Sequence, residues 1–253
     1  MKRKETFNSN TLDRDVWLPH YLPAWSSRSA TQANYELVSN TLRLFIPTAL
    51  KLWCPETHPE PLRVSGIQSG NRSGPVGSRD GQQRFRNDLE VREAQPRFEG
   101  WLQNTGRVAI RCKMNLTPRS MAAMWLSGFE EAPDEAGELC VVEIFGRSVE
   151  ENKSAEIGCG VKKLYDPRLV QDFVTPRINL DIRDFHTYAV EWGAERSKFY
   201  IDGQRVFQSA QAPGYPMQIM IAVFDFPAWD DGSNGDHVPE MVVDWIEGNS
   251  TNE

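Results

Sequence analysis

The sequence predicts an all-β protein built as a sandwich or a barrel. Short runs of alternating hydrophobic and polar residues, separated by turn residues, dominate the chain. No segment of useful length has a helical period, and no internal repeat is present. Residues 216–226 (PMQIMIAVFDF) are mostly apolar, which indicates a strand buried on both faces, as in a two-layer sandwich.

Length and composition exclude several classes of protein. The 253 residues are compatible with one large β domain, so we expect residues 1–253 to form a single domain. Charged residues make up 25% and hydrophobic residues 40%, as in soluble globular proteins. The net charge is −7 and no basic cluster interleaves with aromatic residues, which argues against a nucleic-acid partner. We expect a monomer.

The sequence also bears on location and redox state. No apolar run approaches the roughly 20 residues of a membrane helix, so no membrane partner is expected. No hydrophobic segment follows the basic residues at the start of the chain. The protein is therefore expected in the cytoplasm, or outside the cell if a leader has been removed. The four cysteines are scattered and are expected to be buried thiols: Cys54, Cys112, Cys140 and Cys159.

In chain order, the first half alternates strands with loops. Residues 34–47 predict two strands joined near Ser39 and Asn40. Residues 55–81 are rich in Pro, Gly, Ser and Arg and predict long loops. Residues 106–115 (GRVAIRCKMN) alternate well, and the apolar residues 121–127 precede an acidic loop at 129–137.

The second half continues this pattern. Residues 146–173 are polar and mixed, with no clear element, and residues 185–192 (FHTYAVEW) predict a strand. Residues 198–207 predict a hairpin, because Asp202 and Gly203 tolerate the positive φ of a two-residue turn. Residues 228–238 predict a polar loop, 240–246 a closing strand, and 247–253 a loose tail.

One strand carries the candidate chemistry. Glu138 and Cys140 share a face of this strand because side chains alternate. Glu143 follows Glu138 by five residues and by parity points the other way. A β-bulge at Val141 and Val142 would bring all three side chains to one face. Two carboxyl groups on one face are what glycoside hydrolysis requires, although charged strand ends of this kind are also common as solvated groups.

Several segments together resemble a known family. The run ELCVVE at 138–143 is similar to the motif E-[ILV]-D-x-x-E, and FHTYAVEW followed by KFYIDGQRV is similar to FHTYAIEW and its FYVDG hairpin. GRVAIRCKMN, PMQIMIAVF and MVVDWI are similar to three further strands. With these segments, the chain from 34 to 247 resembles glycoside hydrolase family 16, the laminarinase and lichenase family with a concanavalin A-like fold.

The resemblance implies a fold and a reaction. The fold is a jelly-roll sandwich of two curved antiparallel sheets with a concave substrate cleft. The implied function is retaining endo-hydrolysis of a β-glucan-like polysaccharide with β-1,3 or β-1,3-1,4 linkages. Glu138 matches the nucleophile and Glu143 the general acid/base, with the carboxyl groups ~5–5.5 Å apart. This chemistry requires no cofactor.

The sequence departs from the family pattern at three positions. Cys140 stands where the family has Asp, and it is either a small residue that fills space or a tolerated substitute beside the nucleophile. Ala109 and Ala222 replace a Glu and an Asn that contact sugar in relatives. These departures leave open a catalytically impaired carbohydrate-binding protein of the same fold. A transglycosylase with the same residues is a further alternative.

The resemblance also indicates aromatic residues of a substrate cleft. Trp125 matches a position that is often aromatic near the sugar, although parity leaves open whether Trp125 or Met124 faces the cleft. Phe224 matches an aromatic position on the cleft floor or is a core residue. Trp229 lies in a loop beside the cleft and either stacks on a sugar or anchors the loop.

Three polar residues complete the candidate set. Arg111 matches a family Arg and either lines the cleft or forms an ordinary ion pair between strands. His186 follows the family's Phe-His pair and is either structural or a secondary binding residue. Asp244 matches one ligand of a structural calcium that family members hold on the convex side.

Overall fold

Two large antiparallel sheets packed face to face make up the computed structural model, which describes residues 2–232 and 237–250. We call the first the outer sheet, in which β1 pairs with β19 beside the main path. Its strands, in spatial order, are β17 (Gln204–Ser209), β16 (Ser197–Ile201), β15 (His186–Trp192), β8 (Gly106–Asn115), β19 (Glu240–Asn249), β3 (Thr41–Phe45) and β2 (Tyr35–Val38), with β1 (Lys2–Glu5) added.

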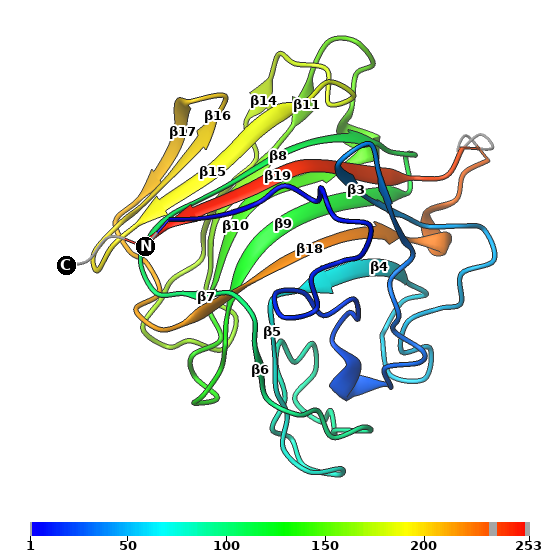
Figure 1. Cartoon of the computed structure of the whole chain (residues 1–253), viewed down its shortest axis with the longest axis vertical. Helices are drawn as coiled ribbons and strands as arrows, with labels where there is room; N and C mark the ends of the chain where they lie inside the picture. The colour runs from blue at the N-terminus through cyan, green and yellow to red at the C-terminus, as the bar shows by residue number, and fades with distance from the viewer. Residues whose placement is uncertain (1, 233–236, 251–253) are drawn as a thin grey trace.

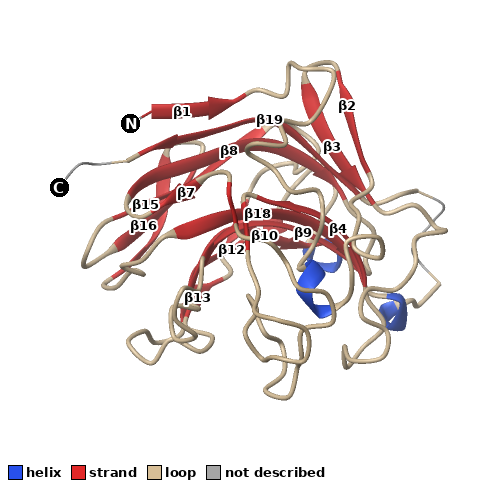
Figure 2. Ribbon diagram, turned by 60° about the horizontal axis from the view of Figure 1, so that its bottom comes forward, coloured by secondary structure: helices blue, strands red, loops and turns tan. Residues whose placement is uncertain are grey.

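We call the second the cleft sheet, in which β7 pairs with β18 beside the main path. Figure 2 shows the two layers, with long loops gathered beyond the cleft sheet. In spatial order its strands are β13 (Asp172–Val174), β12 (Gly158–Lys162), β10 (Glu138–Phe145), β9 (Ser120–Gly128), β18 (Met217–Asp225) and β4 (Arg63–Gln68), with β7 (Leu102–Gln103) added. These sheets confirm the expected jelly-roll sandwich.

Smaller elements lie in the connections. Two short ribbons pair β5 (Gly70–Asn71) with β6 (Phe98–Glu99), and β11 (Ala155–Glu156) with β14 (Arg177–Ile178). The described residues also form three 3-10 helices, η1 (Pro23–Trp25), η2 (Gly146–Ser148) and η3 (Pro227–Trp229). None of the helices in the described ranges is long and apolar enough to cross a membrane.

The cleft sheet is buried on both faces, which explains its continuous apolar strands. In β18, Ile221 and Val223 pack into the main core between the sheets, whereas Ala222 and Phe224 join a second apolar cluster on the opposite face. Residues of the connections, such as Trp25 of η1, cover that face. Burial on both sides removes the polar alternation that a half-exposed strand would show.

Most predicted strands are confirmed, and both predicted turns have the expected backbone. Ser39 and Asn40 join β2 to β3 with φ of 52° and 59°. Asp202 and Gly203 join β16 to β17 with φ of 48° and 79°. Positive φ at both central residues matches the right-handed twist of the flanking strands.

Two predictions are wrong, and a segment without a predicted element contains strands. Residues 55–81, predicted as loops, contain β4, an edge strand that pairs with β18. Residues 146–173, for which no clear element was predicted, contain β12 and the start of β13. The expected loose tail begins inside β19, which runs to Asn249. In each case pairing with a neighbouring strand outweighs the weak strand propensity of Gly, Ser and polar residues. The predicted polar loop at 228–238 and the tail extend partly outside the described residues.

Candidate active site

A β-bulge in β10 gathers the three candidate residues on one face. Against β9, the register shifts between Cys140 and Val142, and against β12 it shifts between Cys140 and Glu143. Val141 and Val142 both pack into the main core, so the alternation resumes one residue late. Glu138, Cys140 and Glu143 therefore line one cavity. The predicted bulge is confirmed.

A glycine on the neighbouring strand lies opposite this bulge. Gly160 pairs with Cys140 and has a φ of 141°, a conformation that residues with side chains rarely adopt. A Cβ at Gly160 would lie 2.4 Å from the carbonyl oxygen of Asp172 on β13. The bulge thus fits β12 only because this position lacks a side chain.

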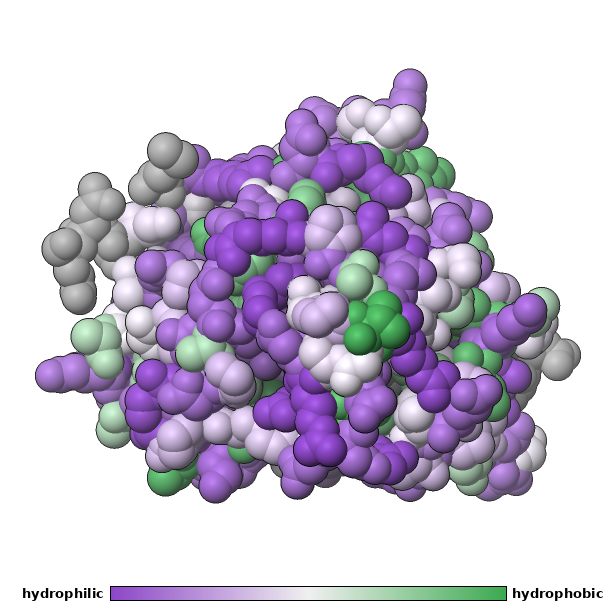
Figure 3. Space-filling model, turned by 90° about the horizontal axis from the view of Figure 1, so that it is seen from below, coloured by the Kyte–Doolittle hydropathy of each residue, from purple (hydrophilic) through white to green (hydrophobic). Residues whose placement is uncertain are grey.

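The cavity lies between the cleft sheet and the loops that cover it. Its volume is about 300 Å³, at the lower end of the range for ligand pockets. Its floor comes from β9, β10, β12 and β18, and its walls from segments near residues 21, 53–62 and 83–85. Seen from below, the surface over these loops is mostly hydrophilic, with small separated hydrophobic areas (Figure 3). A larger hollow of about 840 Å³ on the outer sheet contains none of the predicted catalytic residues.

The carboxyl group of Glu138 is in an unfavourable place for a negative charge. Burial raises its pKa to about 7, Lys162 opposes that effect and Glu143 adds to it. The side chain of Gln83 donates a hydrogen bond to Oε1 of Glu138. Glu138 therefore titrates near neutral pH, held by one amide donor from the loop above it.

Lys162 forms an ion pair with Glu143, a contact that the sequence analysis did not predict. Its Nζ lies 2.7 Å from Oε2 of Glu143, and their side chains are only 24% and 15% exposed. Burial alone would lower the pKa of Lys162, but Cys140, Glu143 and Glu138 around it raise the pKa. The ammonium group is thus charged throughout the working pH range, and it neutralises one of the two carboxylates.

Cys140 is a buried neutral thiol at the centre of this group. It is 1% exposed, and burial raises its pKa well above the usual value. Its Sγ lies 4.0 Å from the carbonyl oxygen of Gly158, the contact that the structure gives it. The thiol therefore adds neither charge nor a strong hydrogen bond between the glutamates.

Aromatic side chains form the apolar wall of the cavity. Trp125 lines it, whereas Met124 packs into the main core, which resolves the open parity. Phe224 lies beside Trp125, with ring centroids 6.2 Å apart. Tyr21 meets Phe224 edge to face at 5.6 Å. Flat apolar faces of this kind suit the apolar faces of sugar rings.

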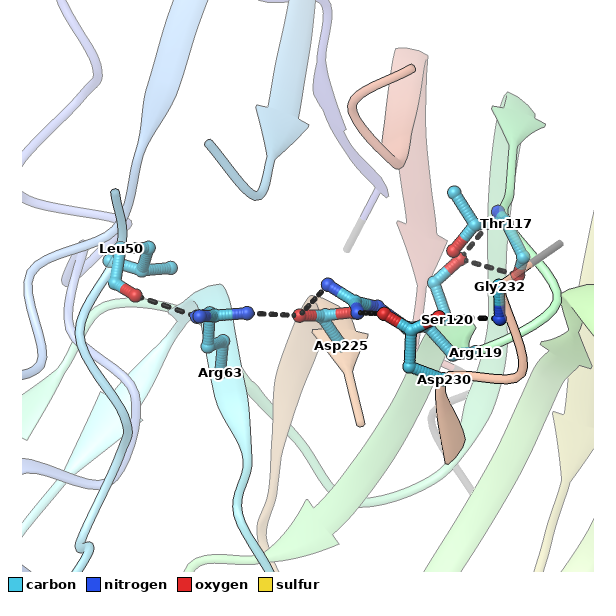
Figure 4. Close-up of polar contacts among 8 residues, drawn as sticks. All are labelled: Leu50, Arg63, Thr117, Arg119, Ser120, Asp225, Asp230 and Gly232. Atoms are coloured by element: carbon cyan, nitrogen blue, oxygen red, sulfur yellow. Dashed lines mark hydrogen bonds and ion pairs between the residues drawn. The ribbon is translucent and has the colours of Figure 1, made fainter. Parts of the chain in front are cut away.

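Trp229 lies next to the cavity and does not line it. Its ring stacks on Phe226, a lining residue, with centroids 4.1 Å apart. Figure 4 shows how the turn after η3 is held: Asp225 bonds Arg63 at 2.8 Å and Arg119 at 2.6 Å, and Arg119 also pairs with Asp230. This partly exposed ionic network, centred on the buried Asp225, holds the turn next to Trp229, whose ring extends the aromatic wall.

The comparison with family models decides the family. The model of glycosyl hydrolases family 16 matches residues 101–247, which include β8 to β10, the bulge and β18. The chain belongs to glycosyl hydrolases family 16. A comparison with curated proteins finds no match.

Solved structures show the same fold at low sequence identity. A GlcNAcα1-4Gal-releasing endo-β-galactosidase from Clostridium perfringens has a TM-score of 0.79 and 23% identity over 97% of this chain. This chain spans 61% of that structure's length. The laminarinase catalytic domain from Thermotoga maritima has a TM-score of 0.69 and 14% identity, and the match covers 99% of this chain and 98% of that structure. The Bacillus licheniformis β-glucanase has a TM-score of 0.62 and 15% identity, and the match covers 99% of this chain and 98% of that structure.

The polar candidates outside β10 do not belong to the cavity. Arg111 lies on β8 of the outer sheet, where it pairs with Asp244 and covers the ring of Phe185. His186 begins β15 of the same sheet and bonds Asp202 through Nδ1 at 2.7 Å. The expectation that Arg111 and His186 line the cleft is therefore wrong. Because alternation is local, it cannot tell which sheet a strand joins.

Ala109, one of the three positions that depart from the family pattern, also lies outside the cleft. Ala109 is fully buried on β8 of the outer sheet, so it does not alter the substrate contacts. Ala222 does lie on the cleft face. A Cβ added at Gly66 would lie 2.8 Å from the Cβ of Ala222. The tight approach of β4 at Gly66 explains a small residue there.

Asp244 does not fit the expected calcium ligand. The Arg111 guanidinium already neutralises its carboxylate, and calcium requires several oxygen ligands. Within residues 2–232 and 237–250, no group of three or more His, Cys, Asp and Glu side chains gathers around a possible metal position. A structural calcium in this family member stays an expectation, without Asp244 as its support.

The sequence analysis did not find the two polar partners of Glu138 and Glu143, which are Gln83 and Lys162. Lys162 lies on β12, in a segment (GCGVK) whose two glycines give it a low strand propensity. Gln83 lies in a covering loop and belongs to no motif. No pattern in the sequence signals Lys162, because only the pairing of β12 with β10 places it opposite Glu138.

Proposed function

We propose that this family member is a retaining endo-glycoside hydrolase that acts on a β-linked polysaccharide. One observation carries the proposal: the bulge in β10 directs Glu138 and Glu143 into the same aromatic-walled cavity. Retaining enzymes use two carboxyl groups on one site in this way.

In the first step, a carboxylate oxygen of Glu138 attacks the anomeric carbon while the bond to the leaving oxygen breaks. Glu143 gives its proton to that oxygen, and a covalent glycosyl-enzyme forms. In the second step Glu143 takes a proton from water, which attacks the anomeric carbon and releases Glu138. The sugar therefore keeps its anomeric configuration.

Lys162 affects these two steps in opposite directions. Its ammonium lies 2.7 Å from Oε2 of Glu143, where it pairs with the carboxylate form of that residue. That form is needed for the second step, where Glu143 acts as a base, and it opposes the first step, where Glu143 must carry a proton. Binding of a sugar in the cavity must therefore weaken the Lys162–Glu143 pair before the leaving oxygen is protonated.

Two substrate classes have support, and solved structures of similar fold include enzymes named for each of them. A β-glucan such as laminarin or a mixed-linkage glucan is the substrate that the family resemblance implies. A galactan-type glycan is the second class, because the endo-β-galactosidase has a higher TM-score, 0.79, than the laminarinase, 0.69. Ala222, which replaces a sugar-contacting polar residue of relatives, supports a substrate other than standard laminarin.

A second candidate function is binding of carbohydrate without turnover. The observations that favour it are the neutral thiol of Cys140 and the ion pair between Glu143 and Lys162, which occupies the carboxyl group of Glu143. A binding protein would keep the aromatic wall and would tolerate the loss of both glutamates. The catalytic proposal requires both.

The test is a screen of purified protein against β-1,3-, β-1,4- and β-1,3-1,4-glucans and against galactans. NMR of the fresh products reports their anomeric configuration, and chain-length analysis separates hydrolysis from transfer to a second sugar. Retained β products with one substrate class support the proposal. Inverted products contradict the mechanism, and binding of a glycan without any bond cleavage favours the second candidate.

A further inference from the structure

The conformation of Gln83 is unusual for a loop residue. It is 9% exposed and has a φ of 49°, in the left-handed region that residues with side chains seldom occupy. Its partner Glu130 is 4% exposed and has a φ of 58°. Strained backbone of this kind persists only where the surrounding contacts hold it, and it concentrates at functional sites.

The contacts of these two residues form a chain that ends on the nucleophile. Oε1 of Glu130 accepts a hydrogen bond from the backbone N–H of Gln83 at 2.7 Å. The Gln83 side-chain amide then donates to Oε1 of Glu138. The carbonyl oxygen of Glu130 accepts a bond from the Arg72 guanidinium. A loop residue is thereby anchored at its backbone and points its donor at the catalytic carboxylate.

The preceding residue locks the same loop. Gln82 accepts a bond from the backbone N–H of Arg72 at 3.1 Å and donates to the carbonyl of Phe129 at 2.9 Å. Its own carbonyl accepts the indole N–H of Trp25 at 2.8 Å. The donor of Gln83 is therefore presented by a rigid segment, as an orienting group must be.

The departure at Cys140 gives this donor a role. A side chain between the two glutamates would ordinarily orient the nucleophile, but the Cys140 thiol makes its contact with Gly158 at 4.0 Å instead. We propose that Gln83, held by Glu130, is the positioning residue for the nucleophile Glu138, supplying from a covering loop the orientation that the middle residue of the bulged strand no longer provides. This inference rests on the proposed function, because it assumes that Glu138 is the nucleophile.

A donor aimed at a carboxylate favours the ionised form of that carboxylate. Loss of the Gln83 amide is therefore expected to make Glu138 harder to ionise and to move the acidic limb of the rate profile to higher pH. The other titratable groups that face Glu138 stay in place in such a variant: Glu143 and Cys140 on β10, Lys162 on β12, and Tyr21, His58, Arg84 and Glu130 on the covering segments.

The experiment compares Gln83→Met with Gln95→Met. Both variants replace a buried amide of the covering loops by an unbranched apolar side chain, and Gln95 bonds Arg28 and Asn71 rather than the site. We expect Gln83→Met to lower kcat by about 10-fold to 100-fold, the range that one hydrogen bond to a charged group corresponds to. We expect its acidic limb to rise by about one pH unit, while Gln95→Met changes thermal stability alone.

A second measurement does not depend on turnover. NMR of protein labelled with ¹³C at glutamate carboxyl carbons follows the titration of Glu138, which Glu138→Gln assigns. A midpoint that rises in Gln83→Met supports the inference even if the wild type cleaves no glycan, in which case the proposed function fails alone. Turnover by the wild type with an unchanged midpoint and kcat in Gln83→Met overturns the inference and leaves the function standing. If Gln83→Met does not fold, Glu130→Leu removes the acceptor of the Gln83 N–H and is expected to shift both quantities the same way.

Discussion

Replacing Glu138 by Gln is expected to abolish turnover and, at the same time, to stabilise the fold above neutral pH. Burial raises the pKa of Glu138 from 4.5 to about 7, so the folded protein binds this proton more tightly than the unfolded chain. Stability from this group is complete below about pH 4.5 and declines as the pH rises through about 7. The amide of Gln has the same shape and does not ionise, so Glu138→Gln does not lose stability as the pH rises.

The magnitude follows from the pKa difference. A change from 4.5 to about 7 corresponds to at most about 3 kcal/mol of lost stability at pH 8. Because the carboxyl group borders the open cavity, and because Lys162 is near, we expect about 1–2 kcal/mol. In a protein of 253 residues this raises the unfolding midpoint by roughly 2–8 °C at pH 8 and by much less at pH 5.

The assay is thermal unfolding of wild type and Glu138→Gln at pH 5 and pH 8, with turnover measured on the same samples. Glu143→Gln is the contrasting variant, because it leaves the half-buried Lys162 without its ion-pair partner and should lower the midpoint at both pH values. An equal midpoint for wild type and Glu138→Gln at pH 8 would refute the raised pKa. Turnover near the wild-type level would refute the role of Glu138 as nucleophile.

Three further predictions address the neighbours of Glu138. Glu143→Gln should lower turnover of polysaccharide by orders of magnitude, and hydrolysis at the wild-type rate would contradict its role. With an aryl glycoside whose leaving group departs without protonation, added azide should restore bond cleavage with a β-glycosyl azide as product, because azide needs no general base. Lys162→Met removes the cation that lowers the pKa of Glu138, so the acidic limb of the pH–rate profile should move to higher pH, and an unmoved limb would show that the two groups are not coupled. Cys140→Asp should keep or raise activity and extend the basic limb of the pH–rate profile. The added negative charge makes it harder for the acid to lose its proton, and Lys162 compensates that charge. A large drop in the unfolding midpoint with no gain in activity would show that position 140 no longer serves the site.

The local pattern of the sequence predicted most of the strands, and the family resemblance indicated Glu138 and Glu143 as the candidate pair. Alternation with period two needs only neighbouring residues, which is why β8, β15 and β19 could be predicted from 106–115, 185–192 and 240–246. The spacing of five between Glu138 and Glu143 likewise implied a bulge, because both carboxyl groups reach one face only if one extra residue intervenes.

Tertiary structure alone decided which strands face the cavity and which residues contact Glu138 and Glu143. Arg111 and His186 lie in strands that the sequence predicts as readily as the strand of Trp125. They nevertheless belong to the outer sheet, because pairing partners far apart in the chain assign each strand to its layer. Lys162 reaches Glu143 across the pairing of β10 with β12, and Gln83 reaches Glu138 from a loop 55 residues earlier. Such contacts depend on how distant segments close on one another, and no local pattern of residues contains that information.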